Sequence, residues 1–266
     1  MILVKAGGGK DINWDGVCKD VAEIRASEPV VLIHGGSVQR DELSERLRVP
    51  VRKVVSPSGI SSVYTDAEGI EVFLMAYAGL ANKRIVARFQ AHGVNAVGLC
   101  GVDGKLWQAK AKKDILVREG GKTKLLKDNL TGRVEAVNAG LVRLLLDAGY
   151  LPVLCAPAIS YENEIVNTDN DTAAAIMAER LGIEKMVYLF EAPGLLRDPD
   201  REETLVRRID RFKVDDFLAF ARERMKKKIM GVKRAIEGGV KAVYFGDGRI
   251  ADPVKSALAG NGTVIS

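Results

Sequence analysis

Apolar runs with the character of strands alternate along this chain with segments of helical periodicity. Residues 1–6 and 30–34 are strand-like, and between them Val17, Val21 and Ile24 recur at helical spacing. The alternation continues to the C-terminus. Because parallel strands need a long crossover, usually a helix, this pattern predicts βαβ units. We expect an α/β fold: a three-layer αβα sandwich on a mainly parallel, open sheet.

The other elements follow from the same periodicity. We expect further helices over residues 66–91, 136–148, 170–181, 213–222 and 224–237, and further strands over 94–99, 151–155, 185–190, 241–245 and 262–265. Residues 105–130 interrupt the alternation with two apolar runs around polar residues and a Gly120-Gly121 turn, which predicts a protruding β-hairpin or meander. We place a lobe boundary near residue 160, between lobes 1–160 and 161–266.

Length and composition exclude several classes of protein. The chain has 266 residues, 47% hydrophobic and 28% charged, which is ordinary for a soluble protein. No apolar run reaches the roughly 18 residues of a membrane span, and residues 1–5 read as a strand and not as a signal peptide. We therefore expect a cytosolic protein without a membrane partner.

Cysteine and charge patterns narrow the chemistry further. Cys18, Cys100 and Cys155 are odd in number and far apart, which favours buried thiols over disulfides or a metal site. The net charge is +5, and the basic runs lack interleaved aromatic residues. Nucleic acid is thus a poor candidate partner, and an acidic substrate, a nucleotide or an acidic protein is a better one.

Two strand-like runs end in consecutive glycines. Val4-Lys5-Ala6 leads into Gly7-Gly8-Gly9, and residues 30–34 lead into Gly35-Gly36-Ser37. Glycines at a strand end let backbone N–H groups approach a phosphate without Cβ interference. No Gly-x-Gly-x-x-Gly or Walker motif occurs, since Gly121-Lys122-Thr123 lacks its upstream glycine. The pair of turns indicates one phosphoryl-transfer site of another kind, although each turn alone could be structural.

Three further segments belong beside these turns. Residues 167–171 place Asn and Asp side chains at a helix start, where simple N-capping is the alternative to a site. Residues 189–196 contain a Pro-Gly turn after a strand, a usual position for a nucleotide in an open α/β sheet. Residues 224–228 begin a helix with a lysine cluster, which could equally be a solvated basic face.

In this order, the segments resemble the amino acid kinase family. The resemblance covers essentially the whole chain and is closest to the branch of N-acetylglutamate kinases and of kinases that act on carrier-bound aminoadipate or glutamate. Ser56-Pro57-Ser58-Gly59 followed by Tyr64-Thr65-Asp66 favours the carrier-protein branch. The other matching segments are Lys5 to Gly8, His34 to Gly36, Tyr77 to Lys83, Gly98 to Gly104, Asn167 to Asp171, Ala192 to Leu195 and Met225 to Lys228.

The resemblance implies roles for individual residues. It assigns the catalytic charges to Lys5, Lys228 and Asp171, the phosphates of ATP to Gly7, Gly8 and Gly36, and the substrate to Gly35, Gly36 and Asn167. It further implies that adenine and ribose lie near residues 189–196 and 210–217, and that Mg²⁺ is carried by the nucleotide with no metal site of the protein's own. His34 is expected to shape its turn.

Two positions depart from the family pattern. The family has an arginine before Tyr-Thr that clamps the α-carboxylate of the acyl amino acid, and this chain has Val63 at that substrate-binding position. Either the clamp is lost, which predicts poor use of free N-acetylglutamate, or a nearby arginine such as Arg52 or Arg84 replaces it. Phe190-Glu191 also replaces the family's Thr-Asp in the nucleotide region.

The resemblance therefore implies an ATP-dependent kinase of lysine or arginine biosynthesis. The expected reaction phosphorylates the side-chain carboxylate of aminoadipate or glutamate whose α-amino group is held by a small acidic carrier protein. Two alternatives stay open: a kinase of free N-acetylglutamate or another small acid, and a catalytically silent amino-acid-binding relative. The family also implies a homodimer through the N-terminal lobe.

Overall fold

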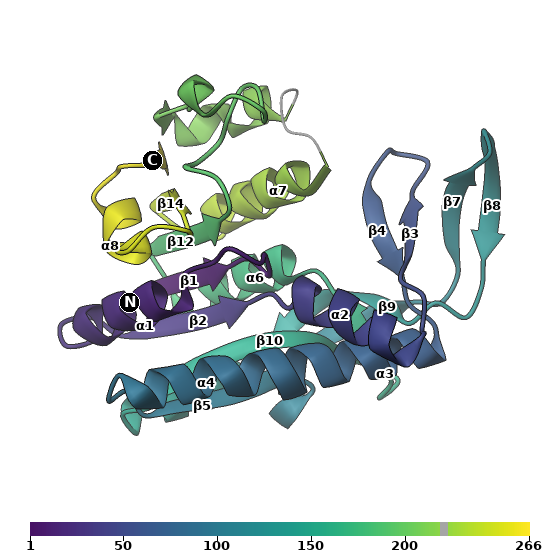
Figure 1. Ribbon diagram of the computed structural model, residues 1–266, viewed down its shortest axis with the longest axis horizontal. Helices are drawn as coiled ribbons and strands as arrows, with labels where there is room; N and C mark the ends of the chain where they lie inside the picture. Colours follow the sequence, from purple (N-terminus) through teal and green to yellow (C-terminus); the bar gives the residue numbers. More distant parts are fainter. Residues whose placement is uncertain (219–222) are drawn as a thin grey trace.

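An eleven-stranded sheet forms the centre of the protein (Figure 1). The computed structural model describes residues 1–218 and 223–266. The strands of this sheet are β1 (Ile2–Ala6), β2 (Val30–His34), β5 (Ala96–Gly101), β6 (Trp107–Lys112), β9 (Thr131–Val137), β10 (Leu151–Ser160), β11 (Ile165–Thr168), β12 (Lys185–Phe190), β13 (Arg208–Ile209), β14 (Ala242–Asp247) and β15 (Thr263–Ile265).

The strand order is β11-β9-β6-β10-β2-β1-β12-β14-β15-β13, with β5 also paired with β10. The pairs β6–β9, β10–β11 and β14–β15 are antiparallel, and the other neighbours run parallel. The mainly parallel sheet expected from the alternation of strands and helices is thus confirmed. Long crossover connections through helices produce this arrangement.

Helices cover both faces of the sheet, which confirms the three-layer sandwich. Alternate residues of a strand point to opposite faces: Ile2 and Val4 pack with α1 (Trp14–Ile24), whereas Leu3 packs with α6 (Asn170–Leu181). Lys5 is in phase with Leu3 and therefore points to the α6 face. The other helices are α2 (Ser37–Leu47), α3 (Ala67–Leu74), α4 (Asn82–Ala91), α5 (Ala139–Asp147), α7 (Glu223–Glu237) and α8 (Pro253–Leu258).

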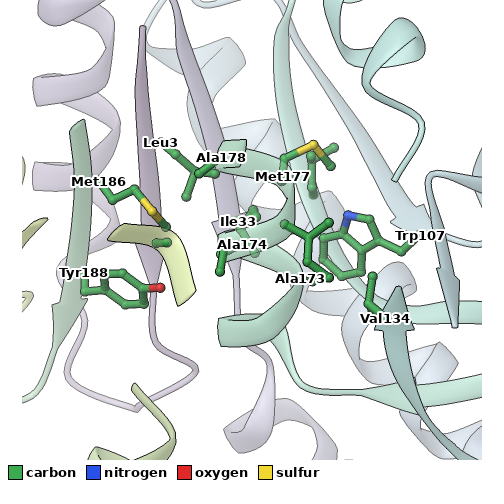
Figure 2. Packing of buried hydrophobic residues seen from close by; sticks show 14 of the residues in the cluster. Leu3, Ile33, Trp107, Val134, Ala173, Ala174, Met177, Ala178, Met186 and Tyr188 are labelled. Carbon is green, nitrogen blue, oxygen red and sulfur yellow. The ribbon is translucent and has the colours of Figure 1, made fainter. Parts of the chain in front are cut away.

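Helix α6 lies in the main hydrophobic core. Figure 2 shows its alanines, including Ala173 and Ala174, between Trp107 of β6 on one side and Tyr188 of β12 on the other. Small side chains let the helix axis approach the strands closely, so that large residues from several strands fill the space around it. Close packing of α6 fixes the first turn of this helix, which contains Asp171.

The antiparallel region differs from its expected form. Of residues 105–130, β6 joins the main sheet, while β7 (Ile115–Glu119) and β8 (Lys122–Leu126) form a hairpin in a second, four-stranded sheet. Its other two strands, β3 (Arg52–Val55) and β4 (Ser61–Tyr64), were not predicted. Both hairpins project from one end of the molecule (Figure 1). The four-residue strands β3 and β4 are too short to give a strong alternating signal.

Several element boundaries also differ from the sequence prediction. The helix expected over 66–91 is three consecutive segments, α3, a π-helix (Met75–Ala81) and α4. The helix expected over 213–222 corresponds to a 3-10 helix (Arg211–Phe217), and residues 219–222 lie outside the described part of the chain. Strand β10 extends to Ser160 instead of ending at residue 155. Within the described residues no helix is long and apolar enough to cross a membrane.

The three cysteines are free and buried, as expected. Burial raises the pKa of the Cys18 thiol to about 12 and raises the pKa values of Cys100 and Cys155 as well. These thiols therefore stay protonated at neutral pH and have little nucleophilic character.

Candidate active site

Lys5, Asp171 and Lys228 meet at the carboxyl end of β1. The Lys5 ammonium lies 2.6 Å from one carboxylate oxygen of Asp171, and the Lys228 ammonium lies 3.6 Å from the other. Lys5 comes from β1, Asp171 from the first turn of α6, and Lys228 from α7. All three side chains are at least 85% buried. One carboxylate thus separates and orients two cations that would otherwise repel each other.

Gly231 explains how α7 reaches this cluster. A Cβ atom added at Gly231 would lie 3.2 Å from the Cβ and the carbonyl oxygen of Asp171. The two helices therefore touch at this point. Lys228 is three residues earlier on the same face of α7, so the close contact brings its ammonium to Asp171. Gly231 was not singled out in the sequence, because a glycine inside a helical pattern has no distinctive signal of its own.

The electrostatics of the cluster favour the ionised forms. Burial opposes ionisation of Asp171, but Lys5 and Lys228 together outweigh it and lower the pKa of the carboxyl from 3.8 to about 2. Burial and the charge of Lys5 lower the pKa of Lys228 from 10.5 to about 8, against the opposing effect of Asp171. The cluster thus has one net positive charge near neutral pH, available to an anion.

The two glycine turns lie against each other beside this cluster. A Cβ added at Gly8 would lie 2.6 Å from the amide nitrogens of Gly36 and Ser37, and one added at Gly35 would lie 2.5 Å from the Gly8 nitrogen. The Ser37 hydroxyl donates to the Gly8 carbonyl at 2.9 Å. Only residues without side chains allow this backbone-to-backbone contact, which is why both turns are glycine-rich.

The turns present unsatisfied backbone donors. Among the described residues, the amides of Gly8 and Gly36 have no hydrogen-bond acceptor, and Gly36 caps the N-terminus of α2 without a side-chain hydrogen bond. The positive end of the helix dipole adds to the attraction for an anion. The resemblance assigns the Gly7 amide to the phosphates of ATP. In this structure the amide instead donates to the Leu189 carbonyl at 2.8 Å.

A buried histidine supports the second turn. Asn82 donates from its side-chain amide to His34 Nε2 at 3.0 Å, and it accepts from Lys83, which fixes the orientation of the amide. His34 Nε2 is therefore an acceptor, and Nδ1–H donates to the Gly35 carbonyl at 2.8 Å. Burial lowers the pKa of His34 to about 4, so the ring is neutral. His34 holds its turn, as expected, and Asn82 is a partner that the sequence did not indicate.

Asn167 faces the same region from β11. Its side-chain amide donates to the Thr65 hydroxyl at 3.0 Å, and Thr65 lines a cavity of about 120 Å³. Val63 lines this cavity too. The remaining lining residues come from α2, the loop after it, the β3–β4 hairpin and α3, and they are Arg40, Ser44, Val49, Pro50, Val51, Arg52, Tyr64, Asp66, Gly69 and Phe73. Phe73 stacks on Tyr77, whose ring lies against Gly36, so these two rings connect the wall of the cavity with the second glycine turn.

Residues 167–171 have both of the roles considered from the sequence. Asp169 is the N-cap of α6 and accepts from the Asp171 and Thr172 amides. Asp171 instead belongs to the lysine cluster, and Asn170 donates to the His34 carbonyl at 2.9 Å. Capping and site formation are compatible, because each of these adjacent side chains takes a different direction.

Two hydrogen bonds fix the region of residues 189–196, where the resemblance implies adenine and ribose. The Leu195 amide donates to the Thr263 hydroxyl at 2.8 Å, which anchors the Pro193-Gly194 turn on β15. Glu191 accepts from the Asp11 amide at 2.7 Å and thus folds over the first glycine turn. Within the described residues, no group of three or more His, Cys, Asp and Glu side chains is arranged to hold a metal ion.

Comparison with known proteins finds similar sequences that match the whole chain. A [LysW]-aminoadipate kinase from Deinococcus radiodurans is 48% identical over all of this chain and 91% of its own length. One from Thermus thermophilus is 46% identical over the full length of both chains. A putative [LysW]-aminoadipate/[LysW]-glutamate kinase from Nitrosopumilus maritimus is 37% identical over all of this chain and 99% of its own.

Solved structures share the fold at low sequence identity. An N-acetylglutamate synthase from Neisseria gonorrhoeae, with coenzyme A and N-acetyl-glutamate, has a TM-score of 0.77 at 23% identity and covers all of this chain and 59% of its own. A carbamate kinase from Giardia lamblia bound to AMP-PNP has a TM-score of 0.67 at 15% identity, with 99% of this chain and 97% of its own covered. The profile of the Amino acid kinase family matches residues 1–247, and the chain belongs to this family.

Proposed function

We propose that this protein uses MgATP to phosphorylate the side-chain carboxylate of aminoadipate or glutamate whose α-amino group is attached to a small acidic carrier protein. The observation that carries the proposal is the Lys5–Asp171–Lys228 cluster beside two glycine turns with unsatisfied amides. The names of relatives at 46% and 48% identity over the whole chain support the acceptor. The product is an acyl phosphate, suited to later reduction.

Carboxylate phosphorylation fits a site without a general base. The acceptor carboxylate is ionised at neutral pH and needs no deprotonation. His34 is buried and neutral and holds its turn. It is not needed as a base, because the ionised acceptor carries no proton to be removed. The barrier is the repulsion between the anionic acceptor and the triphosphate, so the protein contributes alignment and positive charge.

Each cluster residue then has a defined task. Lys5 and Lys228 neutralise charge on the transferring phosphoryl group from two different elements, and Asp171 keeps both ammonium groups aimed at the same point. The amides of Gly8 and Gly36 donate to phosphate oxygens, and Gly35, Gly36 and Asn167 face the acceptor. Mg²⁺ enters with the nucleotide and supplies charge neutralisation when bound.

A basic surface near the acceptor cavity suits an acidic carrier. Lys110 and Lys112 are exposed on β6, and Lys110 is paired in register with Arg133 of β9. Asn129 connects this surface with the cavity. Its side-chain nitrogen donates to the Lys112 carbonyl, and its side-chain oxygen accepts from the amide of Thr65 in the cavity wall. An acidic protein steered to this surface arrives next to the cavity. Lys113 contributes less, because it already pairs with Glu164 at 3.0 Å.

The larger organisation is part of the same proposal. Residues 1–160 form the lobe for the acceptor and for homodimer contacts, and residues 161–266 form the lobe for ATP, with the base near 189–196 and 210–217. The supporting observation is that the site uses both ranges: Asn167 donates to Thr65 of the first range, and Asp171 pairs with Lys5 of the first and Lys228 of the second. Light scattering of the purified protein tests the dimer, and a monomer would contradict it.

The deciding experiment is an acyl-phosphate trapping assay with hydroxylamine. Carrier-bound aminoadipate, carrier-bound glutamate and free N-acetylglutamate are compared at equal concentration with MgATP. We expect the carrier-bound acceptors to give the higher kcat/KM. Efficient use of the free acid instead would identify the family's small-molecule activity, and ATP binding without turnover of any acceptor would identify a silent relative.

A further inference from the structure

We infer that Arg40, on helix α2, binds the carboxylate of the acceptor that is not phosphorylated and so selects dicarboxylic acceptors. The inference rests on the proposed function and goes beyond it, because neither the sequence motifs nor the resemblance points to Arg40. An aminoadipyl or glutamyl group blocked at its amino group has two carboxylates. One receives the phosphoryl group, and the other must be accommodated as an anion.

Arg40 stands at the right place for this task. Its amide donates to the Gly36 carbonyl at 2.9 Å, so it lies one helical turn after the glycine assigned to the acceptor and on the same face of α2. Its side chain is only 8% exposed and lines the 120 Å³ cavity together with Val63 and Thr65. That volume is far above the roughly 10–15 Å³ that a single water requires, so a carboxylate with its carbon chain can enter.

The present partner of Arg40 can be exchanged. Nε and Nη2 of the guanidinium both donate to one oxygen of the adjacent Asp41, at 2.9 and 2.6 Å. Asp41 is 52% exposed, so it can turn into water at little cost when another carboxylate arrives. A guanidinium presents parallel donors that match both oxygens of a carboxylate, which favours a bidentate pair with the acceptor.

The other arginines considered for this role are less suited. Arg52 lines the same cavity, but its side chain is 44% exposed and lies over the Tyr64 ring with Glu119 as its ion partner. Arg84 is exposed on α4 and does not line the cavity. On this inference the carboxylate contact that the family places at position 63 has moved to Arg40 instead of being lost.

The test uses two acceptors that differ only in the non-reacting carboxylate. One is the dicarboxylate, and the other has a primary carboxamide in place of that group. For Arg40→Met we expect a tenfold to hundredfold rise in KM for the dicarboxylate, a smaller change in kcat, and little further effect on the carboxamide. Arg46→Met, an exposed change on the same helix, is the matched control and should leave both acceptors unaffected.

Two further variants guard against a purely structural effect of losing a buried arginine. In the double variant Arg40→Met/Val63→Arg, the KM for the dicarboxylate should fall most of the way back to the wild-type value, because Val63→Arg returns a cation to the same cavity. Arg40→Lys should keep part of the preference for the dicarboxylate. An equal rise in KM for both acceptors, or no rescue by Val63→Arg in a folded double variant, would overturn the inference. Wild type that turns over neither acceptor would overturn the proposed function together with it.

Discussion

At the scale of single residues, the two lysines have different environments but the same predicted role in catalysis. Lys5 is in direct contact with Asp171, whereas Lys228 is farther from it and has a depressed pKa. Lys5→Met and Lys228→Met should each lower kcat by about a hundredfold or more, since each removes a charge that acts most strongly in the transition state, a loss of about 3 kcal/mol.

Steady-state kinetics with saturating MgATP and acceptor measure this effect. The dissociation constant for ATP should change less than kcat in both variants. Circular dichroism and melting temperature establish that the variants are folded. A folded variant with near-normal kcat would refute the assigned role of that lysine.

The pKa of Lys228, about 8, leads to a prediction for nucleotide binding. Bound triphosphate adds negative charge and raises the pKa of this ammonium group, so binding near pH 8 takes up protons. Affinity for ATP should therefore be constant at lower pH and weaken as pH rises through about 8, by at most tenfold per pH unit for one proton. Titration calorimetry in buffers of different ionisation enthalpy measures the uptake.

Lys228→Met is the control for this prediction, because it removes the titrating group and leaves Lys5 and Asp171 in place. The proton uptake near pH 8 should then disappear. If the variant takes up as many protons as the wild type, the titration belongs to another group.

At the scale of elements, the position of α7 depends on one small residue. Gly231 allows α7 to touch α6 at Asp171, with 3.2 Å between an added Cβ and the nearest atoms. Gly231→Ala requires only a small shift of α7 away from α6 and should lower kcat severalfold at most. Gly231→Val adds two more carbons at the contact, should push Lys228 away from Asp171, and should reduce kcat far more than it reduces ATP affinity.

Measuring kcat and melting temperature for Gly231→Ala and Gly231→Val separates a loss of activity from a loss of stability. Gly239, on an exposed turn after α7 with φ of 103° and no atom within 4 Å of an added Cβ, offers a contrast. Gly239→Ala should lower stability through backbone strain without a selective loss of kcat. A selective loss of kcat in Gly239→Ala, or its absence in Gly231→Val, would contradict the proposed packing role.

At the scale of the whole molecule, the docking surface proposed for an acidic carrier contains the exposed Lys110 and Lys112 of β6. Charge reversal at Lys110 and Lys112 should lower kcat/KM for carrier-bound substrate severalfold at low salt. The difference from wild type should shrink as salt rises, because the Debye length is only about 10 Å at 0.1 M. Lys19 and Lys185 are exposed lysines elsewhere on the surface, in ion pairs with Asp252 and Glu28, and their charge reversal is the control for a general change of net charge.

Stopped-flow or steady-state rates at several salt concentrations check this expectation. The control pair should leave both the rate and its salt dependence near those of wild type. A kcat/KM that does not change with salt in wild type, or that responds equally to both charge reversals, would show that docking does not use this surface.

The sequence by itself determined the architecture of this protein, because the alternation of strands and helices and the period of two within each strand are local patterns. Helix 170–181 and strand 185–190 were predicted with their observed bounds. The motif order identified the family, and with it Lys5, Asp171 and Lys228. The hairpin β3–β4 was missed because strands of four residues give little alternating pattern, and the place of β6 in the main sheet was missed because strand pairing depends on distant segments.

Only the tertiary structure decided which groups are free to act. The sequence could not show that the Gly7 amide is bound to Leu189 while the Gly8 amide is not, because hydrogen bonds between distant strands depend on register. It gave no sign of Asn82 as the partner of His34. Nor could it distinguish Arg40 from the chain's other arginines, because burial beside a cavity is set by the packing of α2 against the β3–β4 hairpin and α3, and not by any local pattern.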